Sequence, residues 1–326
     1  MISLNRRAAQ IVQGMMADAE ALGLSVHRLA NGTTVIDAGI AAPGSLLAGQ
    51  RFAEACLGGL GRVDMVRLDF RPEPGRPFWL PGVAVTVSWP GVACLVSQGA
   101  GWRVSCGGWR AMGSGPARSL SAEDSLGARL AYLGYREEAD TAVLLLEGRS
   151  LPGADAATQL AEACHVDPEK LYLLIAPTAS LVGSVQIAAR VVETALHKLM
   201  ELGFDLRQVL ESFGVCPLAP VAGDDLTAMG RTNEAVLYGG QAFLAVRAAD
   251  EELERLVPLV PSSASRDYGV PFLELYRRYG SFYDIDPLLF SPAEVTVNNL
   301  ASGRVFRAGG VDAGLLERAL LGEGEG

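Results

Sequence analysis

The stretch from Val185 to Leu202 constrains the fold of this chain most, because it contains neither glycine nor proline. Apolar residues recur in it at helical spacing, which predicts one long, deeply buried helix with Ser184 as its N-cap. A single narrow polar stripe interrupts the apolar surface, with members three or four positions apart, as on one helix face. The stripe consists of Gln186, Arg190, Glu193 and His197. A charged stripe on a buried helix has to face a partner, a cavity or a ligand.

The pair Arg190 and Glu193 in this stripe admits two interpretations. An arginine and a glutamate three positions apart on a helix most often form a solvated ion pair of little energetic value. The apolar surroundings favour the other interpretation, in which the pair lines a ligand site. The pattern alone leaves both open, and neither assigns chemistry to His197.

Composition limits the class of protein. With 326 residues, the chain is long enough for one large or two ordinary domains, and 49% hydrophobic residues indicate a globular protein. The formal net charge of −10 disfavours nonspecific binding to nucleic acid. Small or cationic ligands therefore remain as the expected partners.

Localisation is expected to be cytoplasmic. The first residues contain no apolar core of signal-peptide length, and no apolar run reaches transmembrane length. The cysteines are odd in number and scattered, without a Cys-x-x-Cys pair, which is typical of reduced buried thiols. They are Cys56, Cys94, Cys106, Cys164 and Cys216.

The order of the expected elements predicts a mixed α/β (α+β) fold with mixed sheets rather than a doubly wound parallel sheet. Asn31-Gly32 predicts a hairpin and the stretch from Gly230 to Asn233 a turn. Helices are expected over residues 4–22, 43–56, 122–133, 155–164, 185–202, 206–213, 251–257 and from 271 onward. Strands are expected over 33–40, 63–70, 83–87, 92–96, 141–146, 171–175, 235–238, 242–246 and 294–298.

The glycine-rich stretch Gly113-Ser-Gly-Pro-Ala-Arg118 has two interpretations. Its backbone amides could cradle an anion beside Arg118. It lacks, however, the third glycine of a dinucleotide fingerprint and the Gly-Lys-Ser/Thr of a P-loop. The pattern favours a tight strand-to-helix turn.

Several kinds of catalytic chemistry have no motif in this chain. His27, His165 and His197 lie in none of the zinc hydrolase or deaminase patterns, and no Gly-x-Ser-x-Gly elbow is present. Asp224 and Asp225 are adjacent and do not form an acid/base pair. Carboxylate and arginine are left to do the chemistry, which suits a substrate that is already electrophilic.

Five long blocks in the same order resemble the methenyltetrahydromethanopterin cyclohydrolase family. The resemblance extends from Ser3 to Gly309. The blocks cover residues 113–118, 183–198, 230–233, 261–269 and 291–298. Blocks of this length in a common order are far more specific than any single short motif.

The resemblance implies a metal-free enzyme that reversibly hydrolyses 5,10-methenyltetrahydromethanopterin to the N5-formyl form in one-carbon metabolism. Tetrahydromethanopterin, or its dephospho form, is then the carrier substrate, and no cofactor is permanently bound. The resemblance also implies two α/β domains, not of Rossmann type, with the pterin in a cleft between them, in a homotrimer or homodimer. We expect residues 1–90 and 205–326 in the first domain, and residues 91–204, with the central helix, in the second.

The family's Arg-x-x-Glu catalytic pair falls on Arg190 and Glu193. In this interpretation Glu193 takes the proton of the attacking water, Arg190 keeps Glu193 ionised and orients the water, and Gln186 steadies Arg190. The other blocks suggest substrate contacts, although the serine-rich loop, residues 261–269, also fits a set of turn and capping residues. The candidate contacts are Gln186, Arg231, Asn233, Ser263, Ser265, Arg266, Glu294, Gly113, Gly115 and Arg118.

Two other functions are considered beside the cyclohydrolase. A carrier protein could bind reduced pterin without turning it over, but retention of both Arg190 and Glu193 favours the enzyme. A folate cyclohydrolase is disfavoured, because those enzymes rest on a dinucleotide-binding fold whose fingerprint this chain lacks. The arginine-rich, lysine-poor composition suggests a bacterium that uses the pathway to oxidise formaldehyde to formate.

Overall fold

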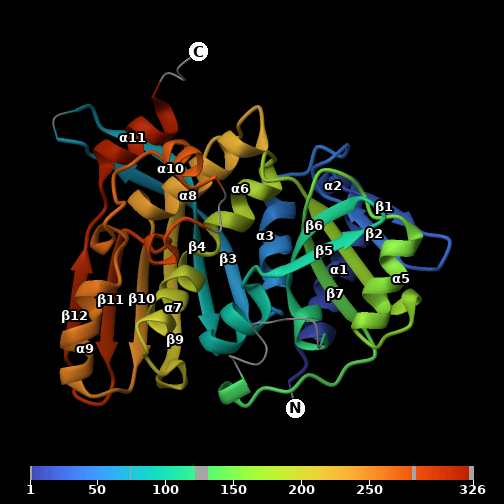
Figure 1. Cartoon of the computed structure of the whole chain (residues 1–326), viewed down its shortest axis with the longest axis horizontal. Helices are drawn as coiled ribbons and strands as arrows, with labels where there is room; N and C mark the ends of the chain where they lie inside the picture. Colours follow the sequence, from blue (N-terminus) through green and yellow to red (C-terminus); the bar gives the residue numbers. More distant parts are fainter. Residues whose placement is uncertain (1, 74, 122–130, 281–283, 323–326) are drawn as a thin grey trace. The chain divides into compact units, whose positions relative to one another are not determined.

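The computed structural model describes residues 2–73, 75–121, 131–280 and 284–322, and within these ranges the strands form two mixed sheets of six strands each (Figure 1). The mixed α/β class predicted from the sequence is thereby confirmed. Two compact units hold these sheets, residues 1–63 with 91–186 and residues 64–90 with 187–326. This division differs from the expected one, because residues 1–63 group with 91–186 and residues 187–204 with the C-terminal part.

The sheet of the first unit is parallel in its centre and antiparallel at its edges. Strand β8 pairs in parallel with both β2 and β7, whereas β1, β6 and β5 pair antiparallel with their neighbours. The predicted Asn31-Gly32 hairpin joins β1 to β2. The strand order is β1 (Ser25–Arg28), β2 (Thr34–Asp37), β8 (Leu171–Ala176), β7 (Ala142–Glu147), β6 (Trp109–Ser114) and β5 (Trp102–Cys106).

Helices cover both faces of this sheet, which explains why β7 is an unbroken apolar run. Val143 and Leu145 pack in one core cluster with α1 (Leu4–Ala17) and α3 (Leu46–Cys56). Leu144 and Leu146 pack in the other, with α5 (Ala154–Ala163). The predicted first helix is present, capped by Ser3, but it is interrupted at Asp18 and continues as α2 (Ala19–Leu22) before Gly23 ends it in the left-handed region.

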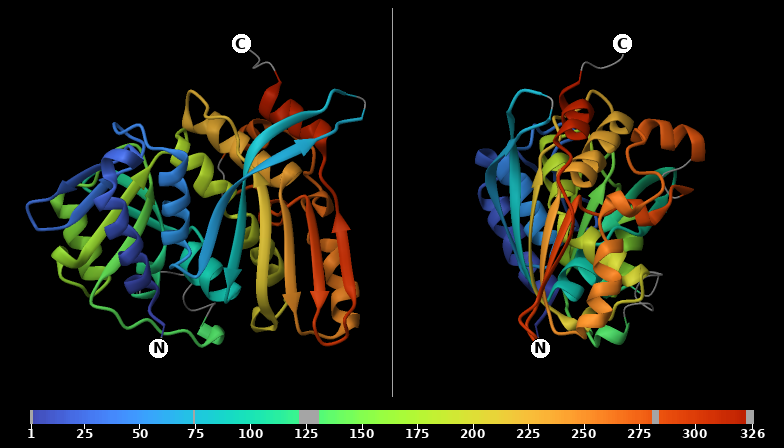
Figure 2. Two further views of the ribbon diagram at one scale, coloured as in Figure 1. Left: turned by 180° about the vertical axis from the view of Figure 1, so that it is seen from behind. Right: turned by 90° about the vertical axis from the view of Figure 1, so that its left-hand side faces the viewer.

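Helices α7 (Val191–Glu201) and α9 (Asp250–Leu256) lie on one face of the sheet of the second unit (Figure 1). In the left view of Figure 2, from the opposite side, the strands lie in front of these helices. Helix α7 approaches β9 closely where Gly214 stands, since a Cβ there would lie 2.7 Å from Cγ1 of Val191. The strand order is β12 (Val305–Gly309), β11 (Glu294–Asn299), β10 (Gln241–Val246), β9 (Val209–Pro217), β4 (Phe78–Ser88) and β3 (Gly61–Phe70). Among the described residues of this unit, the other α-helices are α8 (Asp225–Gly239), α10 (Phe272–Tyr279) and α11 (Ala313–Leu321).

Four sequence predictions on short segments were wrong. Residues 92–96 belong to a π-helix, Gly91–Gln98, and not to a strand. Residues 206–213 form a 3-10 turn, Leu206–Gln208, followed by β9. The predicted turn at 230–233 and the predicted strand at 235–238 both lie inside α8. Short apolar runs fit a strand or a buried helix equally well, and packing decides between them.

Two further observations complete the fold. Most of the helix expected over 122–133 lies outside the described residues, and its end, Ala131–Leu133, is a 3-10 turn. Within the described part of the chain, no helix is both long and apolar enough to cross a membrane.

Candidate functional site

The polar stripe of the central stretch is divided between two helices, so the predicted continuous helix over 185–202 is wrong. Helix α6 (Leu181–Ala188) ends before Arg190, whose backbone angles, φ −86° and ψ 3°, place it as the N-cap of α7. Helix α6 also begins earlier than expected, because the hydroxyl of Ser180, and not Ser184, accepts a hydrogen bond from the Gly183 amide at 2.9 Å. Neither glycine nor proline marks the break, and apolar residues continue across it, so the sequence pattern conceals it.

The break places Arg190 and Glu193 at the start of α7, as N-cap and third helical residue. The free amides of a first helical turn carry partial positive charge, which attracts a carboxylate at this position. Behind the pair, Val191 and Val192 are fully buried, so the helix that presents Glu193 is firmly packed. Gln186 lies on α6, on the other side of the break.

His197 lies one turn further along α7 and contacts a different residue. Its Nε2 atom is 3.8 Å from Oε1 of Glu201, and both side chains are partly exposed. His197 therefore pairs with a glutamate that lies outside the predicted site.

Helix α8 carries Arg231 and Asn233, and the next residue, Glu234, is a buried carboxylate that the sequence analysis missed. Asn233 donates from Nδ2 to the Met229 carbonyl at 2.7 Å, so its amide is bound to its own helix. Glu234 accepts from the Phe272 amide at 2.8 Å and thereby caps α10. Burial raises the pKa of Glu234, opposed by this hydrogen bond and by the Arg231 charge. The sequence pattern predicts a turn over residues 230–233, so it gives no sign that Glu234 lies on the buried face of a helix.

The raised pKa of Glu234 predicts how stability depends on pH. In the folded state the neutral carboxyl is favoured, so the stability it contributes is complete below the ordinary value of 4.5 and is lost as pH rises through the folded pKa. The variant Glu234→Gln retains a side-chain oxygen that can accept from the Phe272 amide, but it has no carboxyl group to titrate. We expect the unfolding free energy of the wild type, minus that of the variant, to fall as pH is raised from 4.5 to 7.

Urea denaturation at several pH values measures this difference. Glu251→Gln, at an exposed position on α9, is the matched control and should give a flat difference. An equally flat difference for Glu234→Gln would contradict the effect of burial.

The serine-rich loop offers a buried hydroxyl to a ligand. Ser263 and Arg266 are exposed, and Arg266 lies 3.7 Å from the carboxylate of Asp267 and 3.4 Å from the Tyr279 hydroxyl. The Oγ atom of Ser265, in contrast, is buried and has no hydrogen-bond partner among the described residues. A buried hydroxyl normally bonds to something, so Ser265 is the loop residue that most needs a ligand or a water.

Glu294 is engaged within the sheet of the second unit. Arg307 donates to its two carboxylate oxygens, at 2.9 Å each, and Gln241 donates to one of them at 3.2 Å. The side chain is only 10% exposed. These contacts favour a cross-strand structural role over a contact with a substrate.

The glycine-rich stretch forms the strand-to-helix turn that its pattern favoured. Strand β6 ends at Ser114, and a 3-10 turn, Pro116–Ser119, follows. The Gly115 amide donates to the Ser97 carbonyl at 2.8 Å, so it is not available to an anion. Arg118 is buried and donates to the Gly99 carbonyl. Gly113 is equally buried, and a Cβ there would lie 3.2 Å from the Trp102 carbonyl oxygen.

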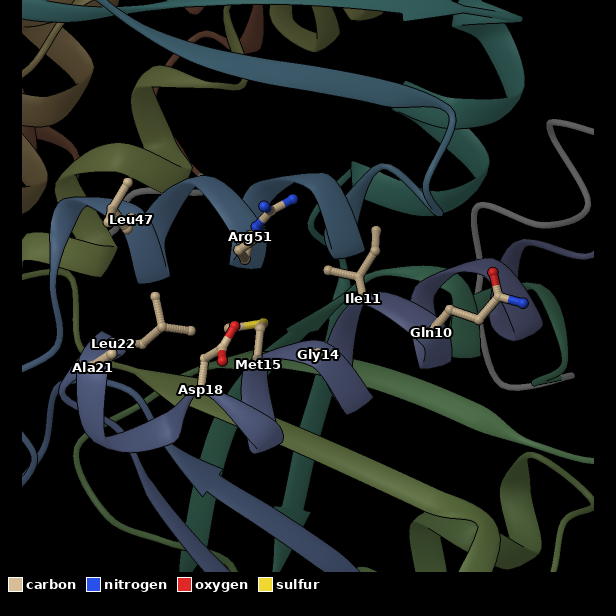
Figure 3. Close-up of a pocket in the computed structure, with 9 residues that line it drawn as sticks. All are labelled: Gln10, Ile11, Gly14, Met15, Asp18, Ala21, Leu22, Leu47 and Arg51. Carbon is tan, nitrogen blue, oxygen red and sulfur yellow. The ribbon is translucent and has the colours of Figure 1, made fainter.

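Helices α1, α2 and α3 enclose a pocket of about 470 Å³ in the first unit (Figure 3). Its wall is largely apolar, with Asp18 and Arg51 as its charged residues, and no candidate site residue lines it. Elsewhere in the residues the structure describes, no three His, Cys, Asp or Glu side chains are grouped so as to hold a metal ion. Neither feature supplies an alternative to the start of α7.

Comparison with known proteins gives a consistent result. Residues 3–320 match the family model described as Cyclohydrolase (MCH). The methenyltetrahydromethanopterin cyclohydrolase of Methanocaldococcus jannaschii is 42% identical over 323 residues, 98% of each chain. That of Methanothermobacter marburgensis is 43% identical over 322 residues, 98% of this chain and 99% of the relative. That of Xanthobacter autotrophicus is 45% identical over 322 residues, which cover 98% of this chain and 93% of the relative.

Proposed function

We propose that this chain, which belongs to the cyclohydrolase (MCH) family, reversibly hydrolyses 5,10-methenyltetrahydromethanopterin to N5-formyltetrahydromethanopterin. The observation that carries the proposal is the near full-length similarity to relatives named for this activity. The chain has the Arg190 and Glu193 pair at the start of a well-packed helix, where a pterin carrier without activity would have no use for it.

The mechanism follows from the charge of the substrate. The methenyl carbon lies between two nitrogens in a cationic amidinium and is open to attack, whereas water is a poor nucleophile. Glu193 takes a proton from the attacking water, and a base positioned in this way contributes about 10²–10⁴-fold to the rate. Attack by water forms a C–O bond and gives a neutral hydroxymethylene adduct. Glu193 then returns the proton to the leaving nitrogen, the bond between this nitrogen and the carbon breaks, and the adduct's hydroxyl group loses its proton to solvent as the formyl C=O forms. Arg190, three residues earlier, orients the carboxylate and the water.

Pterin contacts are proposed for four residues of the second unit. Ser265 has a buried hydroxyl without a partner among the described residues, and Ser263 lies on the same loop. Arg231 and Arg266 supply donors to the pterin edge or its side chain. Asn233 and Glu294, the other candidates there, are bound internally.

We further propose a cytoplasmic homodimer or homotrimer that uses the pterin only as substrate, without a permanently bound cofactor, in the oxidation of formaldehyde to formate. Support for self-association comes from Phe213 and Phe243, which face each other on β9 and β10 and are 41% and 38% exposed. Contiguous exposed apolar surface marks a site of association, and this pair would form its centre. Sedimentation equilibrium of the purified protein gives the number of copies.

One assay tests the proposed function. The purified protein should abolish the absorbance of the methenyl chromophore with the methanopterin substrate, and far more slowly with methenyltetrahydrofolate. Because no zinc motif is present in the sequence, we expect the rate to survive exhaustive treatment with EDTA. Binding of the pterin without loss of the chromophore would indicate a carrier protein, and loss of activity with EDTA that zinc restores would refute the metal-free mechanism.

A further inference from the structure

Lys198 is a buried cation on the same helix as Glu193. It is 2% exposed, and it is one of two lysines in a chain whose other 25 basic residues are arginine. Burial lowers its pKa to about 8, opposed by the charge of Asp286. Burying an ammonium group costs free energy unless hydrogen bonds and opposite charges compensate. The contacts of the Lys198 ammonium therefore indicate its structural role.

The Nζ atom of Lys198 donates to the Pro261 carbonyl at 2.9 Å. The same carbonyl accepts from the Ala264 amide at 3.0 Å, which closes the 3-10 turn Ser262–Ala264. Lys198 therefore binds the first carbonyl of the segment that carries Ser263 and Ser265. A charged donor makes this a stronger hydrogen bond than one between neutral groups.

The neighbouring residue, Ser262, fixes the start of this segment from two other directions. Its hydroxyl donates to the Leu237 carbonyl near the end of α8 at 2.5 Å. Its amide donates to the Pro292 carbonyl, just before β11, at 3.0 Å. The segment is thus tied through Ser262 to α8 and to the residue Pro292 ahead of β11, and through the ammonium of Lys198 to α7.

Asp286 supplies the charge that partly compensates the buried ammonium. Its carboxylate accepts from the Leu288 amide at 3.0 Å and caps the 3-10 turn Pro287–Leu289, against which α7 packs. Its charge favours the ammonium form of Lys198. An apolar residue in place of Lys198 would need neither contact, so packing alone does not explain a lysine at this position.

We propose that Lys198 is a positioning residue for the cyclohydrolase reaction, which sets the Ser263–Arg266 segment relative to Glu193 by holding the Pro261 carbonyl against α7. The inference rests on the proposed function. Glu193 and Lys198 lie on the same helix, α7. The hydrogen bond from Lys198 therefore fixes the distance between Glu193 and the loop for which we propose pterin contacts. Its loss should weaken substrate binding more than it slows the chemical step.

The test compares Lys198→Met with the wild type in the methenyl chromophore assay. Methionine fills most of the space of the lysine stem and removes the donor. Loss of one charge-assisted hydrogen bond should raise KM by about 10-fold or more, with kcat lowered by less than about 3-fold. Leu199→Ala, also 2% exposed and on the same helix, is the matched control and should lower Tm without changing KM.

A double-mutant cycle separates positioning from packing. If Lys198 acts through the loop, Ser265→Ala should raise KM in the wild type and add little in the Lys198→Met background. Asp286→Asn retains the cap acceptor and removes the charge, and it should raise KM by about two- to fivefold, which provides a milder variant should Lys198→Met fail to fold.

The wild-type rate distinguishes failure of the proposed function from failure of the positioning role of Lys198. A wild type without turnover would refute the proposed function itself. An active wild type with unchanged KM in Lys198→Met, or in Asp286→Asn where the first variant does not fold, would overturn the positioning role of Lys198.

Discussion

Glu193→Gln is expected to lower kcat by at least about 10²-fold and to leave KM nearly unchanged. Glutamine retains the size and the hydrogen-bonding ability of glutamate but cannot accept the proton of the attacking water. The substitution should not disturb the helix, because Val191 and Val192 hold the start of α7 in the core. Initial rates from the methenyl absorbance, with Tm measured alongside, give the result.

Arg190→Ala should also lower kcat, because the carboxylate of Glu193 loses the cation that orients it. If the two residues act as one unit, the double variant should be scarcely slower than Glu193→Gln alone. Multiplied effects would mean that Arg190 acts on the substrate independently of Glu193.

A surface ion pair at this position predicts a different pattern. All three variants would then turn over almost normally, with changes in stability below about 1 kcal/mol. Glu201→Gln is the matched control, since this glutamate lies on the same helix and faces His197 at 3.8 Å. Its rate should stay within about twofold of the wild type, and an equal rate for Glu193→Gln would return the central pair to the solvated interpretation.

The fold was predictable where local pattern and burial agree. Strands β7 and β8 are buried on both faces and follow clear turn signals, so their unbroken apolar runs could be assigned from the sequence. The segments at 206–213 and 235–238 were assigned wrongly, because each is a short apolar run whose state is decided by its neighbours in space. Gly230 has the same effect, because a glycine predicts a turn, whereas α8 accommodates this one next to Phe272.

The candidate site was predictable only as far as residue type and spacing reach. Arg190 and Glu193 are conspicuous because they lie three positions apart on a narrow polar stripe bordered by apolar residues, but the break between the helices leaves no trace in the sequence. Glu234 and Lys198 were missed for a different reason. Their importance lies in their burial and in the backbone groups that they bind, and these depend on segments far away along the chain.

The glycine-rich turn provides the second large effect, on stability rather than on turnover. Gly115 has φ +99°, a left-handed value that a β-branched residue adopts only with strain. A Cβ at this position would also lie 2.5 Å from Cδ1 of Leu145, in the core beneath α1 and α3. Strain and overpacking each cost about 1–3 kcal/mol, so Gly115→Val should lower the unfolding free energy by about 2–6 kcal/mol.

Ser119→Ala, in the same turn, is the matched control. It removes a hydroxyl that donates to the Pro116 carbonyl at 2.6 Å from a half-buried position, so it should cost about 1 kcal/mol. Chemical denaturation of both variants measures the difference, and KM of the folded protein distinguishes the two interpretations of the turn. A structural turn predicts that Gly115→Val loses stability while the molecules that remain folded bind substrate normally. An anion cradle predicts the reverse, a raised KM at nearly full stability, because the amides would be displaced from the ligand and not from the core.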